Sequence, residues 1–193
     1  MEAKDKTLLL TLPNILSFLR ILLVPVFVAA ILHKKAFEAL AIFTLAGLTD
    51  VLDGFTARIW RQKTKIGAFL DPAADKLLLT ASFVLLSFSS LSFPNFFPLL
   101  LTVVVIGRDL IIAMGSFVIY RLKNQKTFYP SLLGKASTVC QTGAVFLVLF
   151  FNYLGVSRPF IDWIFYLVLA ITLLSGFQYF AKGFTLLFRP PKK

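Results

Sequence analysis

Four aspartates stand close together in a chain that is otherwise strongly apolar: Asp50, Asp53, Asp71 and Asp75. The whole chain contains only nine acidic residues. An aspartate at the centre of a membrane-spanning helix costs about 2.5–3.5 kcal/mol on insertion scales. A cluster of this kind therefore requires positive charge close by.

The spacing of the aspartates predicts where their side chains point. Asp50 and Asp53 are three residues apart, and Asp71 and Asp75 are four apart, so each pair lies on one face of a helix. The short connection between the two segments makes them antiparallel neighbours. Carboxylates without a nearby Cys or His favour Mg²⁺ or Mn²⁺, with Ca²⁺ as an alternative. We predict a site for one or two divalent ions.

Three residues between the aspartates are suited to a phosphorylated ligand. Gly54 and Gly67 expose bare backbone that a ligand can approach closely. Arg58 follows Gly54 by about one helical turn and offers a planar pair of donors for phosphate. Together with divalent ions, these residues indicate a binding place for a diphosphate.

The composition predicts the elements that must position these residues. The 193 residues are 58% hydrophobic and have a mean hydropathy of +0.85, which is typical of a polytopic membrane protein. Because one span needs roughly 20 apolar residues, we expect a single all-α membrane domain over 1–193 with six transmembrane helices. We place the helices at 14–33, 36–59, 70–91, 96–121, 132–154 and 159–187, after a short amphipathic N-terminal segment.

The distribution of Lys and Arg predicts the orientation, because these residues concentrate on the cytosolic side. Six spans put four basic groups on one side: Lys4 and Lys6; Arg58, Arg61, Lys63 and Lys65; Arg121, Lys123 and Lys126; Arg189, Lys192 and Lys193. We therefore expect both termini and the acidic cluster to face the cytosol of a bacterial inner membrane. The net charge of +11 then reflects topology and attraction to membrane lipids, and no nucleic acid is expected as a partner.

The pattern D-x2-D-G-x2-A-R-x8-G-x3-D-x3-D runs from Asp50 to Asp75 and includes Ala57. It resembles the signature of the CDP-alcohol phosphatidyltransferases, with every position matched. The resemblance extends to "TLPNILSFLR", "GRDL" and "GKASTVCQ", and so covers most of the chain.

The resemblance implies a six-helix membrane enzyme, usually a homodimer, that transfers a phosphatidyl group from CDP-diacylglycerol to an alcohol and releases CMP. It implies that Asp50, Asp53, Asp71 and Asp75 hold Mg²⁺ or Mn²⁺ and that Asp75 also acts as the general base. It further implies that the CDP pocket is lined by Gly54, Ala57, Arg58 and Gly67.

The acceptor is predicted from three cations on different helices, Arg20, Arg108 and Lys135, which we expect to bind an acceptor phosphate. With "PNILSFLR" and "GFQYF", they make the chain similar to the phosphatidylglycerophosphate synthases of the family, whose acceptor is sn-glycerol 3-phosphate. Those enzymes usually carry Arg-Glu where this chain has Arg108 and Asp109. The stretches "LAGLTDVLDGF" and "GRDL" are also similar to the cardiolipin synthases, whose acceptor is phosphatidylglycerol.

Several of these residues also have other interpretations. The aspartates could be helix caps at a membrane surface, and Arg58 could be a membrane anchor. Arg108 could pair with Asp109, although neighbours in a helix point about 100° apart, and we expect Arg108 to face a cavity instead. A cation channel or transporter would also place acids inside a bundle, but these acids gather toward one side of the membrane and no inverted repeat is visible.

Overall fold

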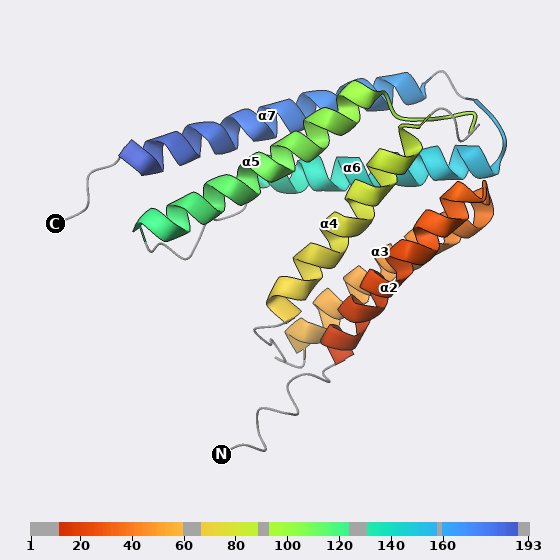
Figure 1. The fold of residues 1–193 in the computed structure, drawn as a ribbon, viewed down its shortest axis with the longest axis horizontal. Helices are drawn as coiled ribbons and strands as arrows, with labels where there is room; N and C mark the ends of the chain where they lie inside the picture. Colours follow the sequence, from red (N-terminus) through yellow and green to blue (C-terminus); the bar gives the residue numbers. More distant parts are fainter. Residues whose placement is uncertain (1–11, 60–66, 89–92, 124–130, 158–159, 189–193) are drawn as a thin grey trace, which may run out of the picture. The chain divides into compact units, whose positions relative to one another are not determined.

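The computed structural model of the chain describes residues 12–59, 67–88, 93–123, 131–157 and 160–188. All regular structure in these ranges is helical, as predicted (Figure 1). The helices are α2 (Leu12–Leu32), α3 (Ala36–Ile59), α4 (Gly67–Leu86), α5 (Leu99–Lys123), α6 (Leu132–Tyr153) and α7 (Ile161–Phe188). The expected amphipathic segment at the N-terminus lies outside the described residues.

Three helix bounds differ from the prediction by three residues or more; α4 begins at Gly67 instead of residue 70, and the other two have local reasons. We expected one helix to run to residue 91, but α4 ends at Leu86. There Ser87 N–H bonds to the Val84 carbonyl and Phe88 N–H to the Leu85 carbonyl, a tighter pattern that closes a helix end. Helix α5 begins at Leu99 instead of residue 96, directly after Pro98, whose carbonyl accepts the first helical hydrogen bonds.

The chain divides into two compact units, residues 1–96 with 145–157 and residues 97–144 with 158–193. In the first unit, α2 packs against both α3 and α4. Phe27 of α2 and Phe43 of α3 are buried with ring centroids 6.2 Å apart. Ala74 and Leu78 of α4 complete this apolar core, which holds together the three helices that carry Arg20 and the aspartate motif.

The second unit has α5 packed along α7, with Phe97 and Phe165 in aromatic contact at 5.3 Å. Its interior also buries polar side chains, unlike an ordinary apolar core. On α6, Gln141 Nε2 donates to Ser137 Oγ at 3.1 Å and to Thr172 Oγ1 of α7 at 3.2 Å, and all three residues are fully buried. Polar contacts of this type join helices in membranes.

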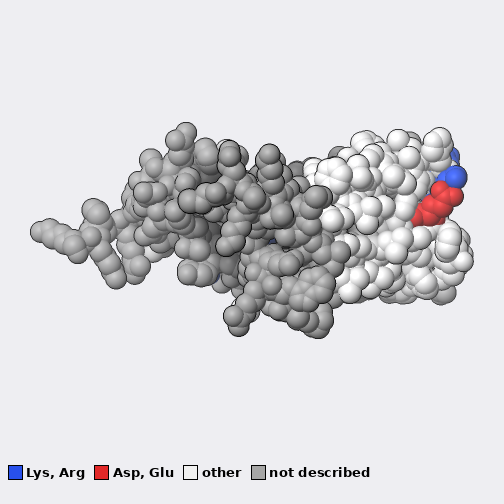
Figure 2. Space-filling model, turned by 90° about the horizontal axis from the view of Figure 1, so that it is seen from below, with Lys and Arg blue, Asp and Glu red and all other residues white. Residues whose placement is uncertain are grey.

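Four of the helices are long and apolar enough to cross a membrane, over Ile15–Leu32, Leu99–Ser116, Leu132–Tyr153 and Ile161–Gly183. Large apolar side chains on them face outward; Trp163, for example, is 76% exposed and Phe177 is 75% exposed. Figure 2 shows one face on which the described surface is almost uncharged, with charged atoms only at one end. This surface suits contact with lipid, and the protein is an integral membrane protein.

The end of α6 is fixed by a pair of buried asparagines in the first unit. Asn152 Oδ1 accepts the Asn95 N–H at 2.9 Å, and Asn152 Nδ2 donates to the Asn95 carbonyl at 2.8 Å. Gly155 then ends the helix in a left-handed conformation, φ +66°, which glycine adopts without steric cost.

We predict that Asn152→Leu lowers the free energy of unfolding by about 1–3 kcal/mol, because it leaves the buried polar groups of Asn95 without these partners. Thermal unfolding of the purified protein in detergent measures the effect. The neighbouring Tyr153→Phe, at a side chain that is 48% exposed, serves as the control and should unfold like the wild type. Equal melting temperatures for all three proteins would contradict the prediction.

Candidate active site

Arg20 of α2 meets one aspartate from each of the predicted pairs. Its Nη1 lies 3.0 Å from Asp50 Oδ1 of α3, and the same nitrogen bonds to Asp75 Oδ1 of α4. The arginine side chain is 1% exposed, whereas the two aspartates are 46% and 37% exposed. The guanidinium is therefore held inside the first unit, with two carboxylates at its solvent-facing side.

This arrangement fits a divalent cation. Oxygens from two different helices converge on a single positively charged atom, so the backbone already brings them within reach of one cation. Among the side chains that the structure describes, no group of three or more His, Cys, Asp or Glu residues could hold a metal ion. Asp53 and Asp71 are not among these side chains. The four-aspartate metal site therefore stays a prediction.

The rest of the motif is placed only by its backbone. Helix α3 includes Asp53, Gly54, Ala57 and Arg58, and α4 begins at Gly67 and includes Asp71. The side chains of these residues lie outside the described set. Their helical backbone keeps Asp53 on the face of Asp50, and Asp71 on the face of Asp75, since residues three or four apart share a helical face.

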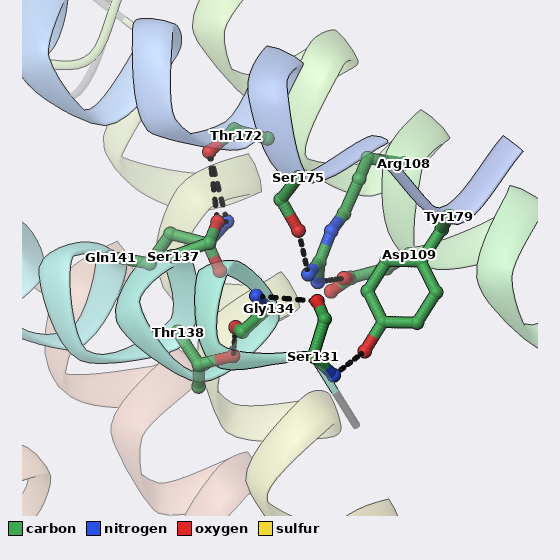
Figure 3. Close-up of polar contacts among 10 residues, drawn as sticks. All are labelled: Arg108, Asp109, Ser131, Gly134, Ser137, Thr138, Gln141, Thr172, Ser175 and Tyr179. Atoms are coloured by element: carbon green, nitrogen blue, oxygen red, sulfur yellow. Dashed lines mark hydrogen bonds and ion pairs between the residues drawn. The ribbon is translucent and has the colours of Figure 1, made fainter. Parts of the chain in front are cut away.

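Arg108, at the middle of α5, is the polar centre of the second unit. It is buried, and its Nη2 donates to Ser175 Oγ of α7 at 2.7 Å (Figure 3). Its Nη1 donates to Asp109 Oδ1, also at 2.7 Å. Our expectation that these neighbours would not pair is wrong, because the long arginine side chain bends back to the adjacent carboxylate. Arg108 Nε is buried and has no hydrogen-bond partner among the described residues.

Tyr179 connects Arg108 to the start of α6. Its ring lies under the Arg108 guanidinium, with 5.6 Å between Arg108 Cζ and the ring centroid. Its hydroxyl accepts the Ser131 backbone N–H at 2.9 Å (Figure 3). Ser131 Oγ in turn accepts the Gly134 N–H at 3.0 Å and caps α6 at the position where serine is favoured.

The three predicted acceptor cations have different surroundings. Arg20 belongs to the first unit and bonds to Asp50 and Asp75, whereas Arg108 and Lys135 belong to the second. Lys135 is exposed on the first turn of α6, directly after Gly134. Tyr179 contacts Arg108 through its ring. It contacts the helical turn that carries Lys135 through the hydrogen bond of its hydroxyl with Ser131.

Sequence reasoning missed the residues that hold Arg108. Ser175 and Tyr179 are four residues apart on α7 and so lie on one face, and Thr172 precedes Ser175 by about one turn. Polar residues at this spacing inside an apolar segment are the signal that could have revealed them. The segment "GFQYF" contains Tyr179, but from the sequence it indicated only a similarity to the family and no role for the tyrosine.

The described helices belong to an integral membrane protein and bury two arginines, Arg20 bonded to two aspartates and Arg108 bonded to an aspartate and a serine. A family model described as CDP-alcohol phosphatidyltransferase matches residues 10–175. The chain belongs to the CDP-alcohol phosphatidyltransferase family and is a phospholipid-synthesizing transferase of that family. This assignment decides between the enzyme and the channel or transporter in favour of the enzyme.

Curated relatives fall into two groups. The CDP-diacylglycerol–glycerol-3-phosphate 3-phosphatidyltransferase of Haemophilus influenzae is 33% identical over 179 residues, which cover 89% of this chain and 94% of that protein. The Escherichia coli protein of the same name is 32% identical over 171 residues, 87% of this chain and 92% of that protein. The cardiolipin synthase (CMP-forming) of Rattus norvegicus is 45% identical over 113 residues, 58% of this chain but only 36% of that protein.

We predict that Arg20→Met destabilises the protein in the absence of divalent cations. Two partly exposed carboxylates lose their shared counter-charge, for which we expect about 1–3 kcal/mol. Thermal unfolding in detergent with EDTA measures the loss, and Arg20→Lys should recover part of it because it keeps the charge. Lys182→Met, at an exposed cation of α7, is the control. An Arg20→Met protein that melts with the wild type would refute the bridging role of Arg20.

Proposed function

We propose that the protein is a phosphatidylglycerophosphate synthase, which transfers the phosphatidyl group of CDP-diacylglycerol to sn-glycerol 3-phosphate and releases CMP. The observation that carries this choice is the similarity to bacterial proteins of that named activity over nearly their full length. The similarity to cardiolipin synthases is higher in identity but covers about a third of their length.

In the proposed reaction, an oxygen of the acceptor hydroxyl forms a bond to the phosphorus that bears the diacylglycerol. The bond from that phosphorus to the bridging oxygen breaks, and CMP leaves with the electron pair. Asp75 takes the proton of the attacking hydroxyl, as a carboxylate within reach of the substrate can. Support comes from its position on α4, where it is partly exposed and oriented by Arg20. No covalent intermediate on the enzyme is required.

We propose that Asp50, Asp53, Asp71 and Asp75 hold two Mg²⁺ or Mn²⁺ ions. The chemistry that such ions supply is neutralisation of the diphosphate and of charge at the attacked phosphorus. Support comes from the oxygens of Asp50 and Asp75, which already meet at one cationic nitrogen. Gly54, Ala57, Arg58 and Gly67 are proposed to line the CDP pocket, Arg58 as the donor to phosphate.

For the acceptor phosphate we propose Arg108 and Lys135. Arg20 is the weaker choice of the three predicted cations, because its Nη1 already bonds to two carboxylates. A guanidinium carries five N–H donors, and Arg108 uses only one donor each for Asp109 and Ser175. The buried Nε of Arg108 is suited to a phosphate oxygen.

Cardiolipin synthesis from CDP-diacylglycerol and phosphatidylglycerol is the second candidate. It is favoured by the 45% identity to the rat enzyme over the shared segment. Both acceptors contain a phosphate bonded to glycerol, so Arg108 and Lys135 suit either one.

The membrane arrangement is proposed from the sequence. We propose six spans, with α3 and α4 added to the four apolar helices, both termini and the active site in the cytosol, and a homodimer in a bacterial inner membrane. The whole chain would form one catalytic domain. Bacterial relatives of similar length support the single catalytic domain and the bacterial membrane.

We predict that Asp75→Asn lowers the rate of CMP release by about 10²–10⁴-fold, the usual contribution of a general base. The amide keeps the shape of the side chain but cannot take up the proton. Asp162→Asn, at an exposed acid in the first turn of α7, is the matched control and should keep full activity. EDTA should stop the wild-type reaction and Mg²⁺ or Mn²⁺ should restore it. A fully active Asp75→Asn enzyme would exclude Asp75 as the base.

The acceptor is tested by offering the purified enzyme CDP-diacylglycerol with either glycerol 3-phosphate or phosphatidylglycerol and identifying the lipid made. We expect a product with a terminal phosphate monoester from the first acceptor and little turnover with the second. Cardiolipin as the main product would replace our choice by the second candidate. CMP release with neither acceptor would refute both.

A further inference from the structure

Two cations of the second unit are connected by one aromatic residue. Arg108 on α5 and Lys135 on α6 are on separate helices, and neither helix alone can set the distance between their charges. Tyr179 of α7 lies near both cations. Its ring centroid is 5.6 Å from Arg108 Cζ. Its hydroxyl bonds to Ser131, which caps the helical turn that carries Lys135 (Figure 3).

The contact between Tyr179 and α6 is close and specific. A Cβ atom added to Gly134 would lie 2.7 Å from the Tyr179 hydroxyl oxygen, nearer than real Cβ atoms approach. The hydroxyl therefore lies directly over the first turn of α6. A side chain at residue 134 would occupy the same space. The tyrosine is only 8% exposed, so this hydroxyl is fixed by protein and not by solvent.

Arg108 is held on three sides but is not saturated. Asp109 and Ser175 each accept one of its N–H groups at 2.7 Å, and the Tyr179 ring covers its face. Its Nε remains buried without a partner among the described residues, and burying such a donor is unfavourable unless a ligand oxygen meets it. The guanidinium is therefore oriented in advance for an additional anionic partner.

We propose that Tyr179 is a positioning residue for the acceptor: it fixes the Arg108 guanidinium and the Lys135-bearing turn of α6 in one geometry that binds a phosphate-bearing alcohol. The inference rests on the proposed function, in which these two cations hold the acceptor phosphate. Tyr179 does not touch the reacting atoms and acts through Arg108 and Ser131. Binding of CDP-diacylglycerol should not depend on it.

Steady-state kinetics with each substrate varied in turn tests this role. Tyr179→Phe keeps the ring over Arg108 but loses the hydrogen bond to Ser131, and we expect the KM for the acceptor to rise about three- to tenfold. Tyr179→Leu also loses the ring, and we expect a rise of roughly ten- to a hundredfold. The KM for CDP-diacylglycerol should stay unchanged in both, and Tyr166→Phe, at an exposed tyrosine of the same helix, should match the wild type.

Gly134→Ala tests the same contact from the other side, because its methyl group must displace the Tyr179 hydroxyl. It should reproduce the selective rise in the acceptor KM if Tyr179→Leu fails to fold. An unchanged acceptor KM in Tyr179→Phe and Gly134→Ala, or equal changes for both substrates, would overturn the positioning role while CMP release continues. A wild-type enzyme that uses no acceptor would instead refute the proposed function itself.

Discussion

The bond of Arg20 to Asp50 and Asp75 is the interaction on which the first unit depends. Carboxylates in an apolar helix bundle are unfavourable without a counter-charge, and a guanidinium buried to 1% exposure is equally unfavourable without acids. Each charge therefore offsets the cost of burying the other. The two ion pairs also join α2, α3 and α4 at one point. The apolar contact of Phe27 with Phe43 also holds α2 against α3. It does not fix which residues of the aspartate motif face one another.

Helix α7 has the corresponding role in the second unit, by different chemistry. Thr172, Ser175 and Tyr179 present hydroxyl groups at about one-turn intervals, and each contacts a polar group on another helix. Apolar packing alone gives little preference for one register between membrane helices, because lipid solvates apolar side chains equally well. Hydrogen bonds to Gln141, Arg108 and Ser131 remove that freedom. The register of α5 and α6 on α7 is thus set by polar contacts.

The sequence was sufficient for the helices and for the family, because both depend on local patterns. Apolar runs ended by prolines, glycines and charges located the six described helices to within a few residues, apart from the serine-rich end of α4. The aspartate motif was readable because its spacing is short. The partners of Arg20 and Arg108 were not readable, since Asp50 is 30 residues from Arg20, and Ser175 is 67 residues from Arg108. Such pairs depend on helix packing, which no local pattern contains.

The signs of the two arginine clusters argue for different ligands. In the described contacts around Arg20, one guanidinium bonds to two aspartates, so these three groups together carry one negative charge, which a divalent cation would complement. Around Arg108, a single aspartate balances the guanidinium, and Lys135 adds a positive charge on the neighbouring helix. A phosphate monoester carries close to two negative charges at neutral pH, and a diester carries one. The buried guanidinium of Arg108 and the exposed Lys135 therefore suit a phosphate group of either kind, in agreement with both proposed acceptors, glycerol 3-phosphate and phosphatidylglycerol.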